Sequence, residues 1–130
     1  MSQTPDEYLN FLSKLSKENI DYWLDFGSAL WAYRNDYIPS NEDLDIGVWG
    51  TEATLVLLHK IVINNFENIC VEEDIWKNNC MRYKITFSTN SDLQVDIRIY
   101  RKYKQYAWTV LFERRTLLKG EEKKGGGTID

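Results

Sequence analysis

The sequence predicts an α+β domain, with a mixed sheet of about five strands and helices packed mainly on one of its faces. Two patterns support this class. In some segments apolar residues recur every three to four positions, as on one face of a helix, and in others every second position, as in half-buried strands. The chain has 130 residues, of which 43% are hydrophobic, enough for one compact domain with a core of its own.

The first third of the chain is predicted to form a helix, a strand and a short second helix. Residues 4–7, Thr-Pro-Asp-Glu, are typical of a helix start: a cap residue, proline at the first helical position, and glutamate three residues after the cap. The apolar face of this helix continues to about Lys17. Residues 22–26 then form a short strand that ends at Gly27, and residues 28–34 form a helix that begins directly at this glycine.

The middle of the chain is predicted to continue with a loop, a second strand and a long helix. The loop covers residues 35–42 and contains Pro39, and the strand covers residues 43–49. Residues 50–52, Gly-Thr-Glu, separate this strand from the next element and cap a helix of about 53–64. Because that helix is apolar on most of its faces, we expect it to lie packed under the sheet.

The remainder of the chain supplies further strands. They are expected over residues 69–76, 81–87 and 93–100, the last after a turn at 90–92. Residues 107–118 fit a helix and a strand equally well. A single domain is therefore expected over residues 1–118. Residues 119–130, rich in glycine and charge, are expected to form a flexible C-terminal tail.

Composition argues against several classes of protein. The net charge of −4 does not suit a protein that grips long nucleic acid, so stable nucleic-acid binding is not expected. The polar, acidic residues 1–7 are unlike a secretory signal, and no apolar run is long enough to span a bilayer, which favours a cytoplasmic protein. A single histidine and no CxxC argue against a zinc site. Cys70 and Cys80 are then expected to be free, partly buried thiols, although they could face each other across a hairpin.

Three acidic side chains in two strands indicate the functional site. Asp43 and Asp45 share one face of the strand at 43–49, opposite its apolar face, because alternate residues of a strand share a face. Asp96 lies on the polar face of the strand at 93–100 for the same reason. If the two strands are neighbours, the three acids converge on the open face of the sheet. They would raise one another's pKa unless a cation neutralises them, and oxygen-only ligands select a hard ion such as Mg²⁺.

Gly27 and Ser28 add a feature that suits phosphate binding. A glycine between a strand and a helix lets a phosphate approach backbone N–H groups at the positive helix terminus, and the serine hydroxyl can add a donor. Taken alone, this pair is better explained as a turn with a serine cap, and Asp43 with Asp45 is equally well explained as a solvated strand face. The combination with Asp96 favours a divalent-metal site that handles nucleotide phosphates.

These residues resemble the nucleotidyltransferase superfamily of DNA polymerase β-like enzymes, and most closely its LicD/fukutin-like branch. The resemblance covers residues 22–49 tightly and 95–100 more loosely. The pattern of the branch is Gly-Thr/Ser, an arginine at the end of the following short helix, Ile-Pro, and an acid-rich Asp-x-Asp. Those places hold Gly27-Ser28, Arg34, Ile38-Pro39 and Glu42-Asp43-Leu44-Asp45. The chain departs from the pattern at residues 40–41, Ser-Asn, where the family usually has a tryptophan.

The resemblance implies the nucleotidyltransferase fold and a Mg²⁺-dependent transferase. Such an enzyme moves a nucleotidyl or phospho-substituent group from an NTP or CDP-linked donor to a hydroxyl of a small molecule or glycan. One or two Mg²⁺ ions, or Mn²⁺ in their place, would bridge the donor phosphates. The implied site residues are Asp43, Asp45 and Asp96 for metal binding and catalysis, and Gly27, Ser28 and Arg34 for the phosphates. Outside the family pattern, Arg98 is a further candidate for donating to phosphate oxygens because it shares a strand face with Asp96, although a surface salt bridge explains this arginine better.

Two other interpretations remain open at the level of sequence. The first is a non-catalytic nucleotide-binding or toxin–antitoxin module on the same fold. The complete set of acids favours the enzyme, whereas the short region after the third acid favours the module. That short region also implies that the acceptor-binding part is reduced, absent from this chain, or supplied by a second copy or a partner subunit. The second is nucleotide addition to nucleic-acid ends, against which the acidic net charge argues.

Overall fold

The computed structural model of the chain describes residues 3–74, 80–104, 106–109 and 113–119. Within these ranges the class predicted from the sequence, α+β, is confirmed. The helices are α1 (Asp6–Lys17), α2 (Phe26–Asn35) and α3 (Glu52–Asn65). The strands are β1 (Tyr22–Leu24), β2 (Leu44–Trp49), β3 (Asn68–Asp74), β4 (Cys80–Thr86), β5 (Gln94–Tyr103), β6 (Tyr106–Trp108) and β7 (Glu113–Lys119).

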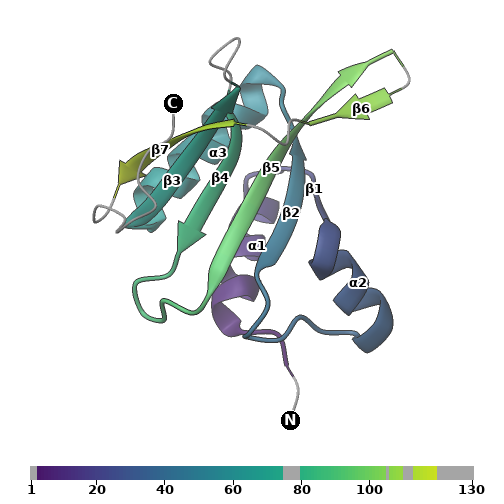
Figure 1. The fold of residues 1–130 in the computed structure, drawn as a ribbon, viewed down its shortest axis with the longest axis vertical. Helices are drawn as coiled ribbons and strands as arrows, with labels where there is room; N and C mark the ends of the chain where they lie inside the picture. Colours follow the sequence, from purple (N-terminus) through teal and green to yellow (C-terminus); the bar gives the residue numbers. More distant parts are fainter. Residues whose placement is uncertain (1–2, 75–79, 105, 110–112, 120–130) are drawn as a thin grey trace.

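The strands form one mixed sheet, shown in Figure 1. Their order is β1-β2-β5-β4-β3-β7, and β6 pairs with the end of β5. Strands β2 and β5 run parallel, whereas the other pairings in the described part of the sheet are antiparallel. Helices α1 and α3 lie together behind the sheet, and α2 lies beside β2 (Figure 1). The two strands that carry the acids are therefore neighbours, as the convergence of these acids requires.

The alternation of apolar residues decides which face of the sheet the helices cover. Every second residue of β2, β5 and β4 is buried against α1 and α3, and burial of each such side chain contributes about 1.5–3 kcal/mol. The residues of these strands that belong to the core cluster are Leu44, Ile46 and Val48 of β2, Val95, Ile97 and Ile99 of β5, and Tyr83 and Ile85 of β4. The helices contribute Tyr8, Phe11 and Leu15 of α1 and Leu58, Ile61 and Val62 of α3. The intervening polar residues are left on the opposite face, which we call the open face.

Helix α1 begins as the sequence predicts, but with a different cap. Pro5 occupies the N-cap position, and no side chain caps the helix. The hydroxyl of Thr4, predicted to be the cap, instead accepts a hydrogen bond from the backbone N–H of Ile38 at 3.1 Å. The prediction of Thr4 as the cap is therefore wrong, because its hydroxyl connects the N-terminal segment to the loop before β2.

Helix α2 begins earlier than predicted. Strand β1 ends at Leu24, and Asp25 is the N-cap, with its carboxylate accepting the N–H of Phe26 at 3.2 Å. Phe26, the first helical residue, has a φ of 43°, which a residue other than glycine rarely adopts. The sharp turn from β1 into α2 is thus made at Phe26, so Gly27 lies within the first helical turn instead of preceding it.

Helix α3 follows the prediction closely. The side chain of Thr51 caps its N-terminus by accepting the N–H of Thr54 at 3.2 Å. The helix is 14 residues long and packs its buried residues behind the sheet, as expected from its apolar faces. In the part of the chain that the structure describes, no helix combines the length and the apolar character needed to cross a membrane.

The segment left undecided, residues 107–118, is strand where it is described. Strand β6 pairs with β5, and β7 pairs with β3, so partner strands and not the local pattern determine its conformation. The described sheet therefore has two strands more than the five predicted. Lys119, predicted to begin the tail, is the last residue of β7. The rest of the predicted tail, residues 120–130, lies outside the described residues.

The hairpin of β3 and β4 carries both cysteines. Neither thiol is part of a disulfide bond, and both residues are half-buried, as predicted. Cys70 lies opposite Lys84 in the ladder and Cys80 opposite Glu73, so the thiols do not face each other across the hairpin. The strand predicted over 69–76 is β3, and the last two residues of that prediction lie outside the described ranges.

Tyr8 of α1 joins two segments that lead to the acids. Its side chain is fully buried, and its hydroxyl donates to the carbonyl oxygen of Glu42 at 2.8 Å. The same hydroxyl accepts the N–H of Gln94 at 3.3 Å. Burial raises the pKa of Tyr8 to about 12, so the hydroxyl keeps its proton for the bond to Glu42. Because Glu42 precedes Asp43 and Gln94 begins β5, this side chain holds the start of both acid-bearing strands.

We expect Tyr8→Phe to lower the free energy of unfolding by about 1–3 kcal/mol, because two backbone groups lose their buried partner. Urea denaturation followed by circular dichroism measures the change. Tyr33→Phe is the matched control, because Tyr33 is 88% exposed. Equal stability of the two variants would contradict the role given to Tyr8.

Candidate active site

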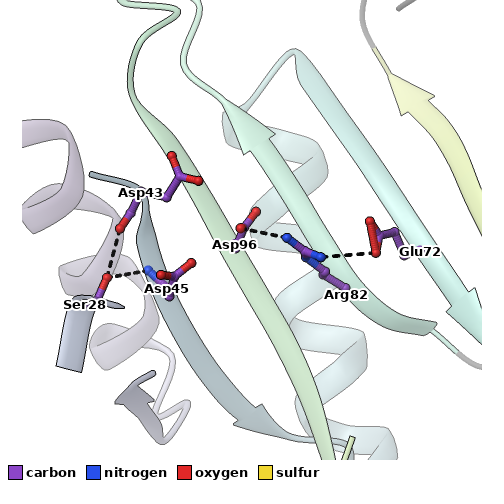
Figure 2. Close-up of polar contacts among 6 residues, drawn as sticks. All are labelled: Ser28, Asp43, Asp45, Glu72, Arg82 and Asp96. Atoms are coloured by element: carbon purple, nitrogen blue, oxygen red, sulfur yellow. Dashed lines mark hydrogen bonds and ion pairs between the residues drawn. The ribbon is translucent and has the colours of Figure 1, made fainter. Parts of the chain in front are cut away.

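Strands β2 and β5 bring two of the predicted acids side by side. In the parallel ladder Asp45 lies directly opposite Asp96, and both belong to the open face. Asp43, immediately before the first residue of β2, lies two positions from Asp45 and so on the same face. Figure 2 shows the three side chains gathered on this face of β2 and β5. Two strands far apart in sequence thus bring the three acids together.

The three carboxylates influence one another electrostatically. Burial raises the pKa of Asp45 to about 7, with further contributions from the negative charges of Asp96 and Asp43. The pKa of Asp43 is also raised, first by burial and then by Asp96. Arg82 opposes both shifts. The site therefore favours the binding of a proton or of another cation at neutral pH.

This shift predicts how stability depends on pH when no divalent ion is present. The pKa of Asp45 is higher in the folded state than its ordinary 3.8, so the folded state binds more protons between pH 3.8 and about 7. The contribution of Asp45 to the free energy of unfolding therefore falls as the pH rises through this window. Because the carboxylate is only half-buried, solvent screening reduces the effect to roughly 1–2 kcal/mol.

Urea denaturation in EDTA at pH 5 and pH 8 measures this dependence. The loss of stability between the two pH values should be smaller in Asp45→Asn than in the natural chain. Asp21→Asn changes an exposed aspartate, and this variant should lose as much stability between pH 5 and pH 8 as the natural chain does. The same loss in all three proteins would show that Asp45 does not titrate in this window.

Ser28 fixes the spacing of the two acids of β2. The side chain is 1% exposed, and its hydroxyl donates to the carbonyl oxygen of Asp43 at 2.9 Å. The hydroxyl also accepts the N–H of Asp45 at 2.7 Å (Figure 2). A second link joins the same strand to α2, since the N–H of Asp25 donates to the carbonyl oxygen of Asp45 at 2.8 Å. The phosphate contact of Ser28 stays a prediction, and the hydrogen bonds observed support a positioning role.

Gly27 leaves open space beside Asp45. A Cβ added to this exposed glycine would lie 3.8 Å from Oδ2 of Asp45, which is an ordinary contact distance. The backbone therefore does not demand glycine here. The missing side chain instead leaves one flank of the carboxylate accessible at the first turn of α2, where N–H groups can receive an anion. The phosphate role of Gly27 also stays a prediction.

Of the two predicted arginines, Arg98 lies near the acids and Arg34 does not contact them. Arg34 is exposed in the last turn of α2, and within the described ranges it forms no hydrogen bond or ion pair with the three acids. Lys84 of β4 lies directly opposite Asp96, and Arg82 lies opposite Arg98. The guanidinium of Arg98 lies over the ring of Phe26, at 5.0 Å from its centroid. Three basic residues of β4 and β5 thus surround the acids.

Arg82 and Glu72 are residues of the site that sequence reasoning missed. Nη2 of Arg82 donates to Oδ2 of Asp96 at 2.8 Å, and Nη1 donates to Oε2 of Glu72 at 3.4 Å (Figure 2). The alternation predicted over residues 81–87 already places Arg82 on the polar face of its strand. What the sequence does not reveal is that β4 lies beside β5, which makes Arg82 a neighbour of Asp96.

An aromatic cluster covers the open face beyond the acids. The ring of Trp23 lies 4.9 Å from that of Trp49 and 5.3 Å from that of Tyr100, measured between centroids. Trp23 also occupies the space above Gly47, where an added Cβ would come within 2.3 Å of its Nε1. The hydroxyl of Tyr100 donates to Asp25 at 2.5 Å. This cluster packs edge strand β1 onto β2 and β5.

The residues present fit a hard divalent ion that is held partly by the oxygens of its ligand. Within the described ranges no three Asp, Glu, His or Cys side chains form a complete metal-binding set. Mg²⁺ does not require one, because it commonly binds one or two carboxylates and completes its shell with water and phosphate oxygens. Oδ1 of Asp96 is buried and accepts no hydrogen bond from the described residues, so the negative charge on this oxygen lacks the partner that a bound cation would supply.

Comparison with known protein families adds independent information. Residues 19–123 match the family described as LicD/FKTN/FKRP, nucleotidyltransferase domain. No curated protein matches the chain. The matched range contains the three acids, the Gly-Ser pair and Arg34, and it covers well over half of the 130 residues. The chain therefore belongs to the LicD/FKTN/FKRP family, whose members are transferases.

Proposed function

We propose that the chain is a Mg²⁺-dependent transferase of the LicD type. It moves a nucleotidyl or phospho-substituent group from an NTP or CDP-linked donor to a hydroxyl of a small molecule or glycan. The observation that carries the proposal is the direct opposition of Asp45 and Asp96 on parallel strands of an open sheet face, with Asp43 beside them. Family membership supports the reaction class, and the opposed acids support metal-assisted phosphoryl chemistry.

In this proposal Asp43, Asp45 and Asp96 hold the ion. A bound Mg²⁺ supplies neutralisation of the phosphate charge and lowers the pKa of an oxygen nucleophile. The acceptor hydroxyl forms the new bond to phosphorus, the bond to pyrophosphate or CMP breaks, and the hydroxyl proton passes to a carboxylate of the site. Ser28 keeps the acids of β2 at a fixed spacing through its two backbone hydrogen bonds.

The basic residues around the acids support a phosphorylated donor. On the open face Lys84 lies opposite Asp96 in the β4–β5 ladder, and Arg98 lies two residues after Asp96 along β5. Their positive charges suit phosphate oxygens, which a site with acids alone would repel. Gly27 supports the same conclusion, because it leaves the flank of Asp45 accessible from the N-terminal turn of α2.

A second candidate function is a non-catalytic nucleotide-binding or toxin–antitoxin module on the same fold. The ion pair between Arg82 and Asp96 favours it, since a guanidinium at 2.8 Å already compensates the third acid without a metal. In such a module the nucleotide would bind without turnover.

Nucleotide binding tests the transferase proposal. We expect a nucleotide and Mg²⁺ together to raise the temperature at which the chain unfolds. The corresponding gain in the free energy of unfolding is about 2.7 kcal/mol when the ligand is at 100 times its Kd. The double variant Asp43→Asn with Asp45→Asn should lose this response. The matched control, Asp21→Asn with Asp36→Asn, changes two exposed aspartates and should keep it. No response of the natural chain to any of ATP, GTP, CTP, UTP or CDP-linked alcohols would contradict the proposal.

Turnover separates the two candidate functions. A panel of donors and hydroxyl acceptors is incubated with the chain and Mg²⁺, and release of pyrophosphate or CMP is measured. Acceptor-dependent release that disappears in the double variant supports the enzyme. Mg²⁺-dependent nucleotide binding without release across the panel supports the module.

A further inference from the structure

Three charged side chains form a row across β3, β4 and β5 on the open face. Glu72 and Arg82 are directly opposite in the β3–β4 ladder, and Arg82 leans diagonally to Asp96 on β5 (Figure 2). Glu72 is 1% exposed and Asp96 is 7% exposed, so both carboxylates are almost removed from water. The guanidinium of Arg82 lies between them and contacts both.

The stability of the fold does not explain this row. Removing three charges from water is costly, and well-packed apolar side chains of similar volume often replace a buried ion network without loss of stability. The ladder also places Arg82 opposite Arg98, and like charges in directly opposed positions are destabilising. A row that is unfavourable in these two respects points to a function beyond holding the sheet together.

The contact with Arg82 distinguishes the two oxygens of Asp96. Oδ2 accepts a hydrogen bond from Nη2 of Arg82 at 2.8 Å. Oδ1 is buried and accepts no hydrogen bond from the described residues. A charge-assisted hydrogen bond to one oxygen restricts the rotation of the carboxylate. Glu72 restrains the same guanidinium from the opposite side. The row therefore holds Asp96 with one oxygen engaged and the other unengaged.

We propose that Arg82 is a positioning residue that presents Asp96 to a divalent cation through Oδ1 alone, and that Glu72 holds Arg82 in place. This inference rests on the proposed function, since it concerns the ion that the three acids would hold. Outer groups that orient metal ligands typically change metal affinity 10–100-fold when they are replaced.

Electrostatics and positioning predict opposite effects of removing Arg82. Arg82→Gln deletes a positive charge beside the acids, so a purely electrostatic role predicts tighter cation binding. Positioning predicts weaker binding, by about 10-fold, because Asp96 loses its fixed orientation. Arg82→Lys keeps the charge but lacks the planar fork that reaches both carboxylates, so positioning predicts weaker binding here as well. The matched control is Arg101→Gln, because Arg101 contacts Met81 and the carbonyl of Cys80 instead of the acids.

The experiment titrates Mn²⁺ alone into the full chain and follows the free ion by electron paramagnetic resonance, with folding checked by circular dichroism. Weaker binding in Arg82→Gln and Arg82→Lys, with unchanged binding in Arg101→Gln, supports the inference. If Arg82→Gln does not fold, Arg82→Lys decides. Unchanged or tighter binding in Arg82→Lys overturns the inference while the proposed function stands. No Mn²⁺ binding by the natural chain alone overturns the inference, whereas the proposed function is decided by the separate test with nucleotide and Mg²⁺ together.

Glu72→Gln tests the outer member of the row. Because Glu72 contacts Arg82, its loss should weaken Mn²⁺ binding by several-fold, less than the loss of Arg82. Glu73→Gln removes the same charge from the adjacent residue of β3 and is the matched control. Equal Mn²⁺ affinities of these two variants would overturn the role given to Glu72.

Discussion

Asp45→Asn is expected to lower transferase activity by about 100-fold or more while leaving the chain as stable as before, or more stable. The loss follows from the site: a carboxylate that holds a metal ion against donor phosphates is worth several kcal/mol in the transition state. The preserved stability follows from burial and from repulsion by Asp43 and Asp96, which together raise the pKa of Asp45 to about 7. Replacing this charge by a neutral amide removes both the cost of burying a charge and the repulsion by the neighbouring acids.

The measurement combines two readouts on the same protein samples. Release of pyrophosphate or CMP from a responding donor gives the activity, and urea denaturation at pH 8 in EDTA gives the free energy of unfolding. Asp21→Asn serves as the matched control for loss of a carboxylate, because Asp21 is exposed and precedes β1, whose first residue pairs with Val48 instead of Asp45. A variant that loses activity only in proportion to a loss of folded protein would refute this explanation.

Gly47→Ala is expected to cause the largest loss of stability among the single substitutions considered, about 3 kcal/mol. The added Cβ would lie 2.3 Å from Nε1 and 2.5 Å from Cε2 of Trp23, so the indole must leave its place. Trp23 is the central residue of β1, which has only three residues and pairs with β2 at the edge of the sheet. Loosening β1 also disturbs the turn that leads to Ser28.

Two comparisons isolate the cause of this loss. Gly27→Ala adds the same methyl group where the nearest atom is at 3.8 Å, and it should change the free energy of unfolding by less than about 1 kcal/mol. Combining Gly47→Ala with Trp23→Leu removes the indole and should recover part of the loss. Urea denaturation of these variants, and of Trp23→Leu alone, supplies the values. A loss in the double variant as large as the sum of the single losses would exclude the clash as the cause.

Local patterns were sufficient to predict the elements that carry the acids. Alternation of apolar residues in β2 and β5 assigns Asp45 and Asp96 to the face opposite the core, because the period of a strand leaves no other choice once one face is buried. Cap chemistry at residues 50–52 predicted the start of α3 to within one residue, and Thr51 is the cap in the structure. Both features depend on a few adjacent residues.

Features that depend on distant parts of the chain were not predictable in this way. The partners of Asp96 follow from strand order, because β4 lies beside β5 and so brings Arg82 to it. The strand state of β7 likewise comes from its pairing with β3. The hydrogen bonds of the Ser28 hydroxyl to two backbone groups of β2 are also a product of the tertiary fold.

The early start of α2 has a local cause that helix propensity does not reveal, since Phe26 adopts a left-handed φ that is unusual outside glycine.

The parallel pairing of β2 with β5 has a consequence for the order of events during folding. Between the two strands the chain forms α3, β3 and β4, so the ladder that joins Asp45 to Asp96 closes a long loop. Contacts of such sequence separation form slowly, because the chain loses the entropy of loop closure before it gains the energy of the contacts. The repulsion between Asp96 and the two acids of β2 thus arises only when this ladder closes. A divalent cation held as proposed would relieve this repulsion, so newly made chains would complete the sheet more readily where such a cation is already present.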